Sequence, residues 1–186
     1  MPTSDLIQLM KEKAEAVQAV VLRIKTMKEA FQYTVDLTRQ QGGTAMVAMG
    51  LETQDVNLLE EACKGAHLTF LKPPLRSYAN DIHTALTLVD WGIAETGTLV
   101  LDSSSEDVRI ATMLSETHVA LLPVSKIKPD TASLEDKINA VLKADGSSYY
   151  AFITGASRTA DIERVLAIGV HGPQELHILI MEENRE

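Results

Sequence analysis

Cysteine is almost absent from this sequence of 186 residues, because Cys63 is the only one. A disulfide within the chain is therefore excluded, and so is a zinc site or iron–sulfur cluster held by cysteines of this chain alone. Such sparing use of cysteine is typical of a reducing compartment, and we predict a cytoplasmic location. The sequence also lacks a signal-peptide core and any apolar run near the ~20 residues that span a bilayer, so no membrane span is expected.

Positive charge is scarce, with 17 Lys and Arg against 26 Asp and Glu and a formal net charge of -9. No basic stripe is present, which argues against nucleic acid as a main partner. The dinucleotide, P-loop and nucleophile-elbow fingerprints are missing as well. The histidines are dispersed without the spacing of metal-ligand pairs, and we predict no metal site. They are His67, His83, His118, His171 and His177.

With 45% hydrophobic and 23% charged residues, the composition is that of a globular domain. Strand-like runs alternate with helical stretches, which predicts an α/β fold with a mostly parallel central sheet flanked by helices. We expect an N-terminal helical extension over 1–16 and a single α/β domain over 17–186.

Apolar patterning predicts strands over 17–25, 44–49, 67–71, 117–124, 148–154 and 175–181. It predicts helices over 4–16, 27–41, 53–64, 76–88, 105–114 and 133–145, with Thr26 as the N-cap of the second. The run 92–101 is predicted to be the central strand.

The motif Glu95-Thr96-Gly97-Thr98 lies inside that predicted central strand. A buried carboxylate is costly without partners, and a partly desolvated glutamate can act as an acid, a base or a nucleophile. Glycines in a strand let another backbone or a ligand approach closely. Two interpretations stay open. Either Glu95 is catalytic beside ligand-binding Thr96, Gly97 and Thr98, or it pairs with an arginine or caps a helix.

A second motif runs from Thr154 to Asp161, where a glycine turn follows a predicted strand. We expect a helix to begin there, beyond the carboxyl ends of the strands, where α/β sheets bind ligands. Helix N–H groups, hydroxyls and a guanidinium suit a carboxylate or a phosphate. The candidate ligand-binding residues are Gly155, Ser157, Arg158, Thr159 and Asp161. The alternative is an ordinary helix cap, with Arg158 paired to a nearby carboxylate.

A third motif, Gly169-Val170-His171-Gly172-Pro173, predicts a tight turn. His171 titrates near neutral pH and is a candidate acid or base, although a hydrogen-bonding strut is the alternative.

Four segments, 90–98, 117–120, 155–163 and 169–173, together resemble the LUD domain family, in particular its lactate utilization protein C (LutC/YkgG) group. The Ser-Arg-Thr-Ala-Asp-Ile-Glu block and the Gly-Val-His-Gly-Pro turn are the specific part of the resemblance. It implies a fold akin to the CoA-transferase and ribose-5-phosphate isomerase (NagB/RpiA-like) group. It also implies a role in oxidising L-lactate to pyruvate with iron–sulfur partner subunits, so that clusters are expected in those partners and no cofactor in this chain.

Other functions stay open, because the chain is shorter at its N-terminus than the typical lactate subunit. One is a stand-alone CoA-transferase-like enzyme that uses Glu95 on a small carboxylate or a phosphosugar. Another is a binding or assembly protein without catalysis. A homo-oligomer is a further candidate assembly.

Overall fold

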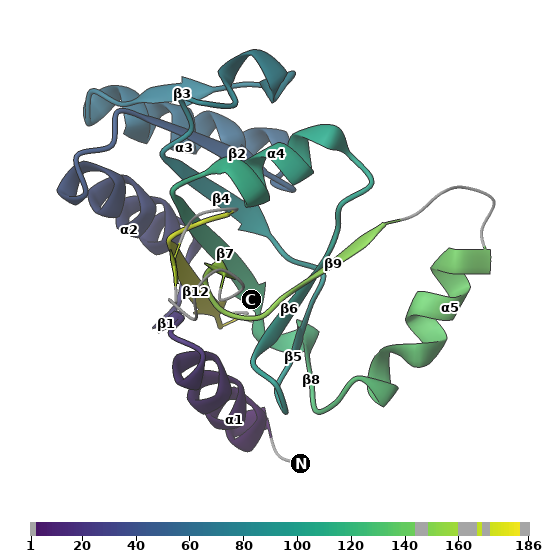
Figure 1. Cartoon of the computed structure of the whole chain (residues 1–186). Helices are drawn as coiled ribbons and strands as arrows, with labels where there is room; N and C mark the ends of the chain where they lie inside the picture. The colour runs from purple at the N-terminus through teal and green to yellow at the C-terminus, as the bar shows by residue number, and fades with distance from the viewer. Residues whose placement is uncertain (1–2, 144–148, 160–166, 169–171, 183–186) are drawn as a thin grey trace.

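Six parallel strands form the central sheet of the protein. The structure is a computed structural model and describes residues 3–143, 149–159, 167–168 and 172–182. The strands are β1 (Val20–Ile24), β2 (Ala45–Met49), β3 (Thr69–Leu71), β4 (Thr84–Leu88), β7 (Thr117–Pro123) and β12 (Glu175–Met181). They lie in the order β1-β12-β7-β4-β2-β3, and each neighbouring pair is parallel (Figure 1). This confirms the predicted α/β class.

Helices α2 (Met27–Gln40) and α3 (Thr53–Gly65) cover one face of the sheet (Figure 1). The Thr26 hydroxyl accepts a hydrogen bond from the Glu29 amide at 3.2 Å, which confirms the predicted N-cap of α2. Apolar residues of α2 at spacings of one and four, Ala30, Phe31 and Val35, are buried against strand side chains. The helical period therefore determined which side of α2 meets the sheet.

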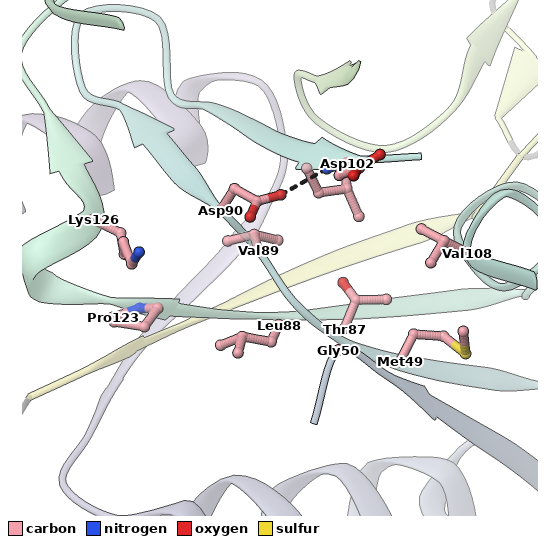
Figure 2. Close-up of a pocket in the computed structure, with 11 residues that line it drawn as sticks. Met49, Gly50, Thr87, Leu88, Val89, Asp90, Asp102, Val108, Pro123 and Lys126 are labelled. Carbon is pink, nitrogen blue, oxygen red and sulfur yellow. Dashed lines mark hydrogen bonds between the residues drawn. The ribbon is translucent and has the colours of Figure 1, made fainter. Parts of the chain in front are cut away.

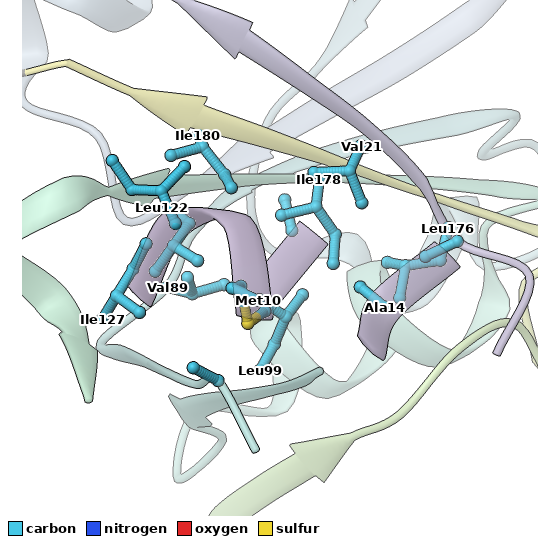
Figure 3. Packing of buried hydrophobic residues seen from close by; sticks show 14 of the residues in the cluster. Met10, Ala14, Val21, Val89, Leu99, Leu122, Ile127, Leu176, Ile178 and Ile180 are labelled. Carbon is cyan, nitrogen blue, oxygen red and sulfur yellow. The ribbon is translucent and has the colours of Figure 1, made fainter. Parts of the chain in front are cut away.

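The opposite face is covered by α1 (Thr3–Ala16), α4 (Glu106–Leu114) and a second, smaller sheet. Figure 3 shows Met10 of α1 among Leu99, Leu122 and Ile178, which come from three strands of the two sheets. Met10 is fully buried. Helix α1 therefore contributes to the hydrophobic core of the α/β fold.

The prediction of a central strand over 92–101 is wrong. Strands β5 (Trp91–Ile93) and β6 (Thr98–Asp102) are the two arms of an antiparallel hairpin, and residues 94–97 form its turn. The hairpin belongs to the four-stranded second sheet, with the order β8 (Ile127–Lys128)-β5-β6-β9 (Tyr150–Ile153). The apolar run was misplaced because burial between two layers gives the same composition as a central strand.

The helix predicted over 76–88 is also wrong. A short 3₁₀ helix, η1 (Leu75–Tyr78), is followed by β4. A fully buried parallel strand has apolar residues on both faces, so its pattern cannot be told from that of a buried helix. The remaining helices are η2 (Val124–Lys126), η3 (Ala132–Leu134) and α5 (Glu135–Lys143).

The helix expected in the motif 154–161 does not begin at Ser157, and a helix that begins after Thr159 would lie outside the described residues. Instead β10 (Arg158–Thr159) pairs with β11 (Ala167–Ile168) in an antiparallel ladder. Asp161 and His171 lie outside the described residues. Within the described ranges, each helix is too short or too polar to cross a bilayer.

Candidate functional site

A cavity of about 400 Å³ lies between α4, β9 and the loop that follows β9, and we call it the loop cavity. Its floor includes His118 and Leu176, the second residues of β7 and β12. The loop therefore lies at the amino ends of these central strands. The prediction that it lies beyond their carboxyl ends is wrong, because β9, which it follows, belongs to the second sheet.

Two of the motifs found in the sequence meet at this cavity. The Ser157 amide donates a hydrogen bond to the Pro173 carbonyl at 2.9 Å. Gly172 packs so closely on Ser157 that a Cβ added there would lie 3.0 Å from the Ser157 Cβ. Gly155, Ser157 and Arg158 all line the cavity. For Thr159, the structure describes only the backbone, which pairs with Ala167 of β11.

Two arginines, Arg109 and Arg158, line the loop cavity. Arg109 Nη1 donates to the carbonyls of Ser103 and Ser104, at 2.5 Å and 2.8 Å, and Arg158 Nη2 donates to the Val17 carbonyl. In the described hydrogen bonds, only one terminal nitrogen of each guanidinium is used, and each group carries five donors. The described lining includes neither aspartate nor glutamate. A cavity rich in donors therefore occurs in a chain of net charge -9.

Three threonine hydroxyls link the β5–β6 hairpin to this cavity. Thr98 Oγ1 lies 2.8 Å from the hydroxyls of both Thr96 and Thr154, and Thr154 lines the cavity. Thr96 and Thr98 are therefore not lining residues, but they are linked to the lining residue Thr154 through hydrogen bonds. Gly97 faces α1, where an added Cβ would lie 2.6 Å from the Ala14 Cα. Because Gly97 has no side chain, the backbone of α1 can pack closely against it.

Glu95 occupies the exposed turn of the hairpin. Its Oε1 accepts hydrogen bonds from the Thr131 amide at 3.1 Å and the Thr131 hydroxyl at 3.3 Å. Thr131 is the residue that precedes η3, so the carboxylate holds the start of that helix. Glu95 is absent from the described lining of the loop cavity, and Arg158 bonds to Val17 in place of a carboxylate.

His118 is a residue of this site that the sequence pattern missed. Its side chain lines the loop cavity, is 1% exposed, and has its Nε2 2.7 Å from the Thr87 Oγ1. Burial lowers the pKa of the His118 imidazole to about 4, so the ring is neutral at neutral pH. A histidine in a buried apolar strand, inside the segment 117–120, was the available signal.

A second cavity, of about 250 Å³, lies at the carboxyl ends of β2, β4 and β7, and we call it the strand-end cavity (Figure 2). The direction of the strand order changes between β2 and β4. From β2 the chain continues to β3 at one edge of the sheet, whereas from β4 it continues to β7 on the other side. Asp90, Asp102 and Lys126 line it, and the Asp102 amide donates to Asp90 Oδ2 at 2.6 Å. Two carboxylates against one ammonium disfavour an anionic ligand.

Metal-binding chemistry finds little support in the part of the chain that the structure describes. His, Cys, Asp and Glu side chains do not gather there in groups of three that could hold an ion. Burial, and next the charge of Glu60, raise the pKa of the Cys63 thiol to about 11, so the thiol stays protonated.

Several known proteins similar to this chain are lactate utilization C proteins. Lactate utilization protein C of Bacillus licheniformis is 35% identical over 112 residues, which cover 56% of this chain and 45% of that protein. YkgG of Escherichia coli, named as an uncharacterized protein, is 28% identical over 97% of this chain and 76% of its own length. The chain spans about half the length of the lactate utilization C proteins that it matches.

The fold also occurs in a crystal structure of a DUF162 family protein from Deinococcus radiodurans. The two structures align with a TM-score of 0.66 and 15% sequence identity, over 97% of this chain and 99% of that one. The LUD domain model matches residues 7–181 of the sequence, almost its whole length. The chain therefore belongs to the LUD domain family.

Proposed function

We propose that this chain is a subunit of a lactate-utilization system and that it binds a small organic carboxylate in the loop cavity. In the proposed system, iron–sulfur partner subunits carry the electrons when L-lactate is oxidised to pyruvate. The relatives named lactate utilization protein C support the first part. The geometry of the cavity supports the second.

The observation that carries the ligand proposal is that Arg109 and Arg158 both line the cavity, while its described lining includes no aspartate or glutamate. Guanidinium groups bind carboxylates through two parallel hydrogen bonds, and such charge-assisted bonds are stronger than neutral ones. Backbone carbonyls already fix one terminal nitrogen of each group, which lowers the entropy lost when a ligand binds.

The strand-end cavity serves as an internal comparison. A small carboxylate placed there would meet Asp90 and Asp102, and like charges at short distance repel. We therefore expect an anion to bind in the loop cavity and not in the strand-end cavity, although both cavities lie on the same face of the sheet.

The ligand proposal is tested by NMR titration of the purified protein with L-lactate and pyruvate. Arg158→Lys keeps the charge but loses the planar fork, and we expect it to weaken binding about tenfold, while Arg158→Gln weakens it further. Asp90→Asn in the strand-end cavity keeps the oxygen that accepts from Asp102 and is the matched control. Binding that changes with Asp90 and not with Arg158 would contradict the proposal.

The partner proposal needs a separate experiment. The chain is expressed together with iron–sulfur subunits of a lactate-utilization system, and lactate oxidation is followed with an artificial electron acceptor. We expect a complex that co-purifies and oxidises L-lactate only when this chain is present. Full activity of the iron–sulfur subunits alone would contradict a role for this chain.

A further inference from the structure

The hydrogen bonding of His118 has a consequence for the ligand. The imidazole is buried and lines the loop cavity, and Nε2 is its bonded nitrogen. Nδ1 has no hydrogen-bond partner in the part of the chain that the structure describes. Because Thr87 occupies Nε2, Nδ1 is the ring nitrogen that remains for a ligand in the cavity.

We propose that His118 Nδ1 recognises the oxygen on C2 of the bound acid, which makes the loop cavity selective for 2-hydroxy and 2-oxo acids over unsubstituted carboxylates. This inference rests on the proposed function, in which Arg109 and Arg158 bind the carboxylate. It adds a specificity-determining residue and a substrate class to the same site.

The Thr87 hydroxyl lets the same imidazole recognise both classes of acid. When Thr87 donates its proton to Nε2, the ring proton is on Nδ1, which then donates to a 2-oxo carbonyl. When Thr87 instead accepts from Nε2–H, Nδ1 is unprotonated and accepts from a 2-hydroxyl group. Rotation of one hydroxyl and a change of tautomer therefore match the ring to either ligand without any change of net charge.

The neutral state of the ring is consistent with this role. Burial holds the His118 pKa well below neutrality, so the imidazole keeps one nitrogen able to accept. The charged groups in the described lining, Arg109 and Arg158, carry positive charge, which also disfavours a second positive charge on His118. Both conditions keep the two tautomers available across the physiological pH range.

The test compares L-lactate, pyruvate and propanoate by ligand-observed NMR titration. The three acids share a three-carbon chain and a carboxylate, and they differ at C2. We expect lactate and pyruvate to bind about five- to tenfold more tightly than propanoate, the effect of one hydrogen bond. Equal affinity for all three acids overturns the role of His118 but leaves carboxylate binding intact. Failure of all three to bind overturns the proposed function as well.

Two substitutions separate recognition by His118 from a structural role. Asn places its amide near the position of Nδ1, whereas Gln places it near Nε2, where it can still bond to Thr87. We expect His118→Asn to keep much of the preference over propanoate and His118→Gln to lose it, with propanoate affinity unchanged in both. The melting temperature of each variant verifies that it is folded. A preference retained equally by Gln overturns the proposal.

If both variants fail to fold, Thr87→Ser and Thr87→Val provide the second test. Serine keeps the hydroxyl that positions the ring, and valine replaces it with a methyl group of the same shape. We expect the preference over propanoate to survive in Thr87→Ser and to fall severalfold in Thr87→Val. An unchanged preference in Thr87→Val overturns the switching role of the hydroxyl.

Discussion

The Nε2 atom of His118 lies 2.7 Å from the Oγ1 atom of Thr87, inside the central sheet where β7 pairs with β4. Both side chains are 1% exposed. Thr87 lines the strand-end cavity and His118 lines the loop cavity. One buried hydrogen bond therefore joins the walls of the two cavities.

The pH dependence of stability should report on His118. Its pKa is about 4 in the folded protein against an ordinary value of 6.5, so the unfolded chain binds more protons between these values. The free energy of unfolding should therefore fall by roughly 3 kcal/mol as the pH drops from about 6.5 to about 4. Above pH 6.5 this contribution is fully present.

Urea unfolding at pH 7.5, 6, 5 and 4.5 measures the effect. The curve of free energy against pH should be flatter for His118→Gln than for the wild type in this range. His67→Asn is the matched control, because His67 is exposed and has a positive φ of 60° that asparagine tolerates. Equal slopes for wild type and His118→Gln would contradict the assignment.

Gly97→Ala should be strongly destabilising. The residue has a φ of 65°, and its Cβ would lie 2.6 Å from the Ala14 Cα, so the substitution adds both backbone strain and overlap with α1. We expect a loss of about 3 kcal/mol. Gly42→Ala separates the two costs, since Gly42 has a φ of 78° with no atom within 4 Å of the added Cβ. Its loss should be only about 1 kcal/mol. Thermal or urea unfolding compares them, and similar losses would show that α1 does not pack as described.

Tyr33→Phe should destabilise the junction of α2 and β12. Burial, and next the charge of Glu175, raise the Tyr33 pKa, so its hydroxyl stays protonated, and it lies 2.7 Å from His177 Nδ1. Because His177 Nε2 donates to the Glu175 carboxylate at 2.8 Å, Nδ1 of the neutral ring accepts from Tyr33. His177 is 4% exposed, and the loss of this donor should cost about 1–2 kcal/mol of unfolding free energy. Tyr149→Phe is the control, because Tyr149 is 62% exposed. Chemical denaturation measures both, and equal effects would contradict the prediction.

Glu95→Gln tests the catalytic role predicted for this residue. Because Glu95 is exposed and accepts from Thr131, we expect a change in stability below about 1 kcal/mol and unchanged binding of lactate. Mass spectrometry after incubation with acyl-CoA donors searches for a covalent adduct on Glu95. An adduct that disappears in Glu95→Gln would instead support a stand-alone transferase.

The sequence predicted most elements whose period was unambiguous. Helix α2 combined an apolar face with Thr26 as its cap, and β12 was a short apolar run between turn residues. The predictions from the sequence were wrong for segments that are buried on both sides. Strand β4 resembled a helix, and the β5–β6 hairpin resembled one central strand, because composition alone does not tell which layer buries a residue.

The sequence by itself determined the α/β class, the scarcity of cysteine and of positive charge, and the motifs around Ser157 and Pro173. Only the tertiary structure decided which residues share a cavity. It brought Arg109, Arg158 and His118 together from a helix, a loop and a strand, and it placed Glu95 at an exposed turn. The physical reason is that local patterns record periodicity and turns, whereas the strand order and the packing of the second sheet depend on contacts between residues far apart in the chain.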